Sequence, residues 1–149
     1  MSWPFIRKEQ GIMNLVEQLL KADAKKASER ETGTFKSRRL AKILGSDDPV
    51  EIRLQEIGTR RLNDILAFQV DKKGNVDLSK SLDSKLLCCV EGITEPGMKD
   101  KNLQRHFNCA TPKDLALALF GFEVTDISDA ICALSGVTEE DTEEEIKNS

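Results

Sequence analysis

The sequence has 149 residues and a net charge of −4, with 39% hydrophobic and 32% charged residues. This length supports one domain with a single core, and the hydrophobic fraction excludes a wholly disordered chain. The acidic balance excludes a global attraction to nucleic acid, and no apolar run approaches the ~20 residues that span a bilayer.

The N-terminal third begins with a short leader and an amphipathic segment. Residues 1–12 are too short and too quickly charged for a signal peptide, and we expect a flexible leader. Apolar side chains recur at helical spacing from Ile12 to Leu20. They predict an amphipathic helix over residues 12–28, polar in its second half, in a segment that ends at Gly33.

A small β element is predicted next. Residues 34–39 favour a strand, a helical turn with Leu40, Ile43 and Leu44 follows, and Gly45 closes that turn. Residues 50–54 alternate apolar and charged side chains, the clearest period-two pattern in the chain. Because two strands alone are marginally stable, we expect helices to cover one face of this two-stranded element.

Two longer helices are predicted after residue 58. Thr59 is the candidate N-cap of the first, and residues 71–75 form a turn or the tip of a hairpin. The second covers residues 78–93 and is expected to be the central buried helix. Its predicted buried stripe is Leu82, Leu86, Val90 and Ile93.

Capping residues predict three short helices in the last third of the chain. Asp100 can cap a helix that runs to Phe107, and Thr111 followed by proline can open the next. The third has an apolar stripe that starts at Val124, and Gly136 ends it.

Together these elements predict a mainly α, α+β fold. We expect a compact bundle of short helices with a two-stranded β element near residues 34–56, in one domain over residues 13–136. The last thirteen residues hold six acids and one lysine. This composition predicts a disordered acidic tail over residues 137–149.

The sequence offers no convincing catalytic, cofactor or metal site. His106 and Cys109 lie three residues apart, but nothing around them resembles a thiol-enzyme signature. The cysteines lack the spacing of a zinc site, and we expect buried reduced thiols. We therefore predict a protein that is not an enzyme and carries no cofactor or metal.

Basic side chains cluster early in the chain, at Lys36, Arg38, Arg39, Lys42, Arg60 and Arg61. As a nucleic-acid patch this stretch lacks interleaved aromatic residues and a helix–turn–helix pattern. A solvated face, or a site for an acidic partner segment, remains the alternative interpretation.

The order of segments resembles a known family. The run FKSRRLAKILG at residues 35–45 precedes the alternating strand, and EPGMKDKNLQRHF at 95–107, ATPKDL at 110–115 and LFGFEVTDISDAICALSG at 119–136 follow. In this order they resemble the XkdN-like tail assembly chaperones of tailed phages and phage-tail-like elements, over roughly residues 13–137. Family members often carry an aromatic residue after the final Ser-Gly, where this chain has Val137.

The resemblance implies a cytoplasmic protein that binds the tape measure protein, promotes assembly of the tail tube and is absent from the mature particle. The tail tube protein and a second copy of the chain are further candidate partners, whereas nucleic acid and membrane are not. Alternative interpretations are a small structural neck or baseplate component and, less favoured, a nucleic-acid-binding regulator.

A surplus of apolar residues marks the candidate protein-binding site. Five large apolar side chains in the eight positions from residue 115 to 122 cannot all face one core. The candidate protein-binding residues are Leu115, Leu117, Leu119, Phe120, Phe122, Ile127 and Ile131. The alternative is that Leu117 and Phe122 pack against neighbouring helices.

Overall fold

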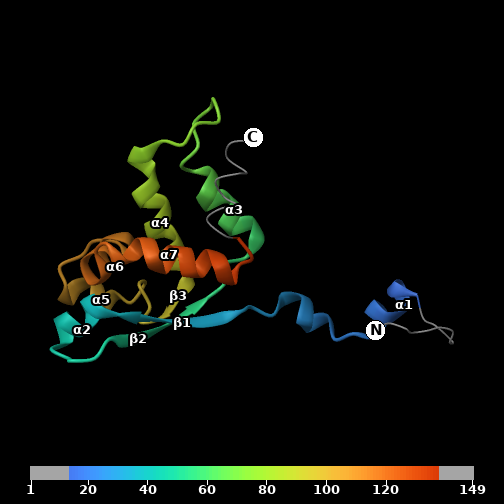
Figure 1. Ribbon diagram of the computed structural model, residues 1–149, viewed down its shortest axis with the longest axis horizontal. Coiled ribbons are helices and arrows are strands. Elements are labelled where there is room, and N and C mark those ends of the chain that lie inside the picture. Colours follow the sequence, from blue (N-terminus) through green and yellow to red (C-terminus); the bar gives the residue numbers. More distant parts are fainter. Residues whose placement is uncertain (1–13, 138–149) are drawn as a thin grey trace.

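The computed structural model describes residues 14–137 and consists of a compact body with an N-terminal arm (Figure 1). The predicted leader and the acidic tail from residue 138 onward lie outside the described residues. Within the described part, seven α-helices accompany a three-stranded sheet, so the α+β class is confirmed. None of these helices is long and apolar enough to cross a membrane.

The arm consists of helix α1 (Leu15–Lys21) and the 3₁₀ helix η1 (Ala24–Ser28). The single helix predicted over residues 12–28 is wrong, because the backbone is extended at Ala22 and Asp23. Asp23 accepts a hydrogen bond from the Lys25 backbone N–H and so begins a new turn. No residue of α1 or η1 is buried.

The sheet has the order β1-β2-β3 and is antiparallel, with β1 at Thr32–Ser37, β2 at Val50–Gln55 and β3 at Ile93–Glu95. The predicted two-stranded element is therefore corrected to three strands. Ile93, expected to end a helix, pairs with Leu54 on the open side of β2. This pairing satisfies backbone groups that two strands alone would leave exposed.

Two predicted boundaries around β1 shift for local reasons. Gly33 lies inside β1 and does not end the preceding segment, and a Cβ atom there would meet Leu134 at 3.2 Å. The strand ends at Ser37, because the Ser37 side chain accepts a hydrogen bond from the Leu40 N–H (3.0 Å) and caps helix α2 (Arg38–Leu44). Gly45 closes α2 with φ +71°, as expected.

The remaining helices are α3 (Thr59–Ala67), α4 (Leu78–Gly92), α5 (Lys101–His106), α6 (Pro112–Phe120) and α7 (Glu123–Leu134). The predicted caps Asp100 and Thr111 are confirmed, since both side chains accept backbone hydrogen bonds from the first turn. Thr59 is not a cap, because the N-cap of α3 is Gly58. Val70 pairs with Val76 across the predicted hairpin tip.

The core lies between the inner face of the sheet and helices α4, α6 and α7. Helix α7 crosses α4 and packs against it, and α6 packs on both of them (Figure 1). Ile52 and Leu54 of β2 point into this core, whereas the alternate residues Glu51 and Arg53 face solvent. Leu82, predicted in the buried stripe of α4, is instead 46% exposed.

Candidate protein-binding surfaces

The structure divides the seven predicted protein-binding residues into two groups. The first group is fully buried and forms part of the core: Leu115, Leu119, Phe120, Ile127 and Ile131. The second group is Leu117, which is 41% exposed, and Phe122, which is 99% exposed. In this fold, Leu117 and Phe122 are the predicted residues available to a partner.

Phe122 stands in the short connection between α6 and α7. We call this connection, with Leu117, the α6–α7 corner. Gly121 has φ +55°, a conformation that favours glycine, and it turns the chain sharply between the two helices. A Cβ atom at Gly121 would approach the Nε atom of Arg39 to 3.1 Å. Glycine therefore allows both the turn and the close passage of the Arg39 side chain.

Two polar side chains fix the corner to α2 on either side of Phe122. Before it, the Arg39 guanidinium donates from Nη2 to the Ala118 carbonyl oxygen (3.1 Å). After it, the Glu123 carboxylate accepts hydrogen bonds from the Ser37 Oγ (2.6 Å) and from the Arg38 N–H (2.9 Å). Since charge-assisted hydrogen bonds are the stronger kind, the exposed ring is carried by a rigid segment.

Sequence reasoning missed the positioning roles of Arg39 and Glu123. Glu123 lies in the first turn of α7, where an acidic residue is common for helix-dipole reasons alone. Its partners are Ser37 and Arg38, about 85 positions earlier in the chain. No local pattern connects residues at such a separation.

A second apolar surface is a groove beside α2, which we call the α2–α5 groove. It has a volume of about 420 Å³ and lies between α2, the start of β2, the end of β3, and α5 from Leu103 onward. Apolar side chains from these elements dominate its lining: Leu40, Ile43, Leu44, Val50, Leu103 and Phe107. Ile43 and Leu44 remain 40% and 65% exposed. Glu51, Glu95 and His106 also line the groove.

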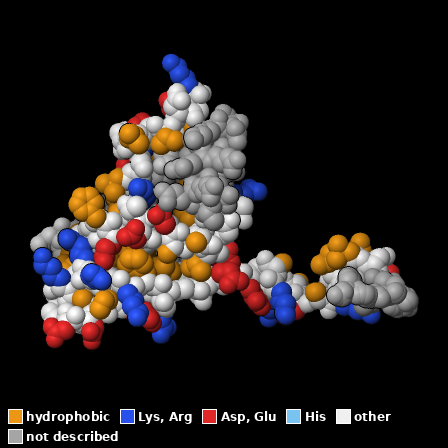
Figure 2. All heavy atoms as spheres, viewed as in Figure 1, with side chains coloured by type: hydrophobic (Ala, Val, Ile, Leu, Met, Phe, Trp, Pro, Cys, Tyr) orange, Lys and Arg blue, Asp and Glu red, His pale blue; other side chains and the backbone are white. Residues whose placement is uncertain are grey.

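A third apolar surface is one side of the arm helix α1. Leu15, Val16, Leu19 and Leu20 are between 63% and 80% exposed. Figure 2 shows apolar side chains on the surface of the arm. The predicted amphipathic character is confirmed for α1, but the apolar stripe does not contribute to the core.

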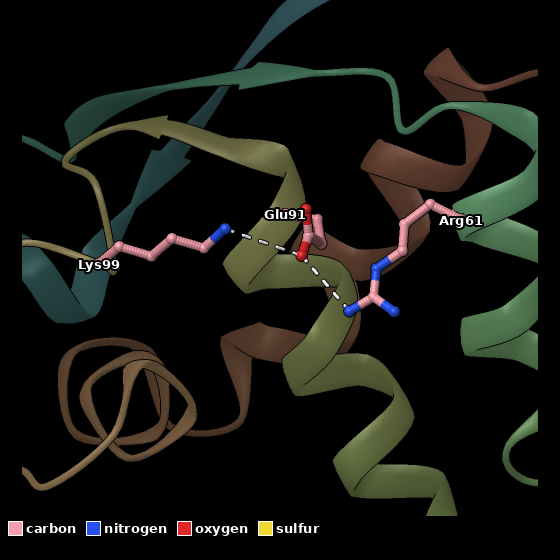
Figure 3. A network of polar contacts seen from close by, with 3 residues as sticks. All are labelled: Arg61, Glu91 and Lys99. Carbon is pink, nitrogen blue, oxygen red and sulfur yellow. Dashed lines mark hydrogen bonds and ion pairs between the residues drawn. The ribbon is translucent and has the colours of Figure 1, made fainter.

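The six basic residues do not form one patch. Four lie on β1 and α2, and two lie on α3, at opposite ends of the body (Figure 1). The Arg61 guanidinium is 3.4 Å from the Glu91 carboxylate, which Lys99 also approaches to 3.9 Å (Figure 3). Because one of these arginines faces an acid on α4 and Arg39 holds the α6–α7 corner, a continuous nucleic-acid surface lacks support.

The cysteines and the single histidine form no catalytic arrangement in the described residues. Cys88 and Cys89 are buried, whereas Cys109 and Cys132 are half-buried, so the expected burial holds for two of the four free thiols. The Cys88 thiol donates a hydrogen bond to Cys132, which raises the pKa of Cys88 and lowers the pKa of Cys132.

His106 and Cys109, which the sequence did not support as a catalytic pair, make no hydrogen bond to each other in the described residues. His106 is exposed and its ring meets Phe107 edge-on, while the Cys109 thiol donates to the Phe107 carbonyl oxygen (3.4 Å). Among residues 14–137, no group of three His, Cys, Asp or Glu side chains is placed to hold a metal ion.

The fold and these surfaces define a small α+β protein that presents apolar side chains on a rigid, charged body. The family model of the phage XkdN-like tail assembly chaperones matches residues 16–147. The chain therefore belongs to this family of tail assembly chaperones. Comparison with curated proteins and comparison with solved structures both find no match.

Proposed function

We propose that the chain binds the tape measure protein in the cytoplasm and promotes assembly of the tail tube around it. It acts by binding, without catalysis or a cofactor, and it leaves before the particle of the phage or prophage matures. Family membership supports the chaperone role. The observation that carries the binding site is Phe122, which is 99% exposed on a corner fixed by hydrogen bonds.

An exposed aromatic side chain on a rigid segment is well suited to anchor a protein partner. Binding energy in interfaces is concentrated in a few buried anchors, and aromatic residues are frequent among them. Because the backbone that carries the ring is already held in place, this segment loses little conformational freedom on binding, which preserves affinity. We infer that Phe122 inserts between apolar side chains of a tape measure helix, with Leu117 beside it.

Two aspartate substitutions test this site. Phe122→Asp and Leu117→Asp place a charge at the proposed contact, and each is expected to weaken tape measure binding by about tenfold or more. Leu78→Asp is the matched control, because Leu78 is an exposed apolar residue at the far end of α4. Binding to the tape measure protein is measured by isothermal titration calorimetry or by surface plasmon resonance. Urea unfolding checks that each variant keeps its fold.

Two results would contradict a binding site at the α6–α7 corner. If both corner variants bind the tape measure protein as tightly as the wild-type chain, the α6–α7 corner is not the anchor. If Leu78→Asp weakens binding equally, the effect of the substitutions is not specific to the corner.

Absence from the finished particle is tested separately by quantitative mass spectrometry of purified tails. We expect the chain at well below one copy per tail. A stoichiometric amount would instead favour a structural neck or baseplate component.

A further inference from the structure

Two free thiols from different helices are in contact at the place where α7 crosses α4. Cys88 belongs to α4 and Cys132 to α7, and the Cys88 thiol donates a hydrogen bond to the Cys132 sulfur. The Ser128 hydroxyl hydrogen-bonds to both sulfur atoms. The two sulfur atoms are therefore held beside each other, and one common neighbour orients both.

Small residues bring the two helices close together at this crossing. Gly92 follows Cys88 by about one helical turn, so both face the same side of α4. A Cβ atom at Gly92 would lie 2.5 Å from Cδ1 of Ile131, the residue next to Cys132 in the chain. Ser128, about one turn before Cys132, is 5% exposed. A disulfide joins Cα atoms about 4.4–6.8 Å apart, and a helix crossing as close as this one offers such separations.

The two thiols differ in exposure and in charge state. Cys88 is 1% exposed, whereas Cys132 is half-buried. The hydrogen bond from Cys88 lowers the pKa of Cys132, although burial and the carboxylate of Asp129 act in the opposite direction. The thiolate is the form that reacts with oxidants. A small oxidant therefore meets Cys132 first, with Cys88 as the protonated thiol behind it.

We propose that Cys88 and Cys132 are a redox-modified pair, which hydrogen peroxide converts into an intramolecular disulfide between α4 and α7. The Cys132 thiolate attacks one oxygen of the peroxide, and the O–O bond breaks. The products are a sulfenic acid at Cys132 and a hydroxide ion, which takes up the proton that Cys132 released.

The second step joins the two side chains. The Cys88 sulfur attacks the Cys132 sulfur, so the S–S bond forms and the S–O bond breaks. The hydroxide leaves as water with the proton from Cys88. Over both steps the two thiols lose two electrons and two protons, and one hydrogen peroxide is reduced to two molecules of water.

The crosslink has two physical consequences. It closes the chain between residues 88 and 132, a stretch that contains β3, α5 and α6, and so restricts the unfolded chain more than the folded one. It also stops the oxidation of Cys132 at a stage that a thiol reductant reverses. The pair does not include Leu117 or Phe122, so the proposal goes beyond the tape measure site and does not depend on it.

The other two cysteines serve as internal controls. The Cys89 thiol donates to the Val124 carbonyl oxygen (3.6 Å), and the Cys109 thiol donates to the Phe107 carbonyl oxygen (3.4 Å). Cys89 also lies near Cys132, but its hydrogen bond directs its thiol to the backbone of α7. We therefore expect neither Cys89 nor Cys109 to replace Cys88 in the crosslink.

Oxidation of the full chain, followed by mass spectrometry, tests the proposal. The reduced protein is treated with hydrogen peroxide, then unfolded and alkylated, and the crosslinked peptides are identified after digestion with trypsin. Cys88 and Cys89 fall in one tryptic peptide, so variants must tell them apart. Cys88→Ser and Cys132→Ser remove the pair, and Cys89→Ser and Cys109→Ser are the matched controls.

We expect alkylation of all four thiols in the reduced chain and of two in the oxidised chain, whose mass before alkylation falls by two hydrogen atoms. Oxidised wild type should unfold at a higher urea concentration than reduced wild type, and dithiothreitol should reverse this shift. Cys89→Ser and Cys109→Ser should show the same crosslink and the same shift. Cys88→Ser and Cys132→Ser should show neither.

Three results would overturn the proposal. One is a wild-type chain that keeps four alkylatable thiols after peroxide treatment. Another is a crosslink that contains Cys89 or Cys109, or that joins two chains. The third is Cys132 oxidised to the sulfinic acid while Cys88 stays a free thiol. Peptide mapping of the wild-type chain needs no substitution, so a variant that fails to fold does not remove the test.

Discussion

Replacing Gly92 with alanine tests the packing of α4 against α7. Gly92 is the last residue of α4, and Ile131 of α7 lies directly against it. A Cβ atom at residue 92 would be 2.5 Å from Cδ1 and 2.6 Å from Cγ2 of Ile131. Carbon atoms prefer separations of about 3.5–4.0 Å, so the added methyl group overlaps two atoms by about 1 Å.

Two effects of opposite sign compete in this substitution. Alanine is favoured over glycine in a helix by about 1 kcal/mol, which would raise stability. Overpacking a dense core lowers stability by about 1–3 kcal/mol. Because Ile131 is fully buried and has little room to move, we expect Gly92→Ala to lower the free energy of unfolding by about 1–2 kcal/mol.

Urea unfolding measures this change, and Gly97→Ala is the matched control. A Cβ atom at Gly97 would have nothing within 4 Å. The control should therefore be neutral or slightly stabilising, by up to about 1 kcal/mol. A Gly92→Ala variant as stable as wild type would refute the packing argument.

A double variant sharpens the test. Ile131→Val removes Cδ1, the atom nearest the new methyl group, and alone lowers stability by about 0.5–1.5 kcal/mol. In the Gly92→Ala background its cost should fall by at least about 0.5 kcal/mol, because the closest part of the overlap is relieved. Strict additivity of the two substitutions would contradict a direct contact.

Two further predictions concern polar groups. Glu123→Gln weakens the hydrogen bonds to Ser37 and Arg38 and should lower stability by about 2 kcal/mol in urea unfolding; a change under about 0.5 kcal/mol would contradict the anchoring role. Burial raises the pKa of Cys89 from 9.0 to about 12, so above pH 9 the unfolded chain loses this proton first. Cys89 alone should then lower stability by about 1.4 kcal/mol per pH unit towards pH 12, and Cys89→Ala should show a smaller loss. An equal loss in the variant would contradict this assignment.

Local signals predicted the helix starts well. Asp100 and Thr111 were identified as caps because a capping side chain bonds to backbone within its own first turn. Thr59 failed by one position, because Gly58 can take the cap conformation without a side-chain bond. Such boundaries depend on residues a few positions apart, which a sequence displays directly.

Long-range contacts were beyond the sequence pattern. Ile93 fits the helical spacing of α4, yet it leaves the helix because β2 offers a strand to pair with. The apolar run at residues 115–122 correctly predicted that some of these side chains would lie outside the core. Which residues are exposed depends on the turn at Gly121 and on the bonds of Arg39 and Glu123 to other elements.

The most direct test of the account is co-expression of this chain with the tape measure protein from the same gene cluster. The soluble fraction of the tape measure protein is compared with and without the chain, and the chain is then pulled down by an affinity tag. The account predicts that the tape measure protein becomes soluble and co-purifies with the chain. A tape measure protein that stays insoluble and does not co-purify would contradict it.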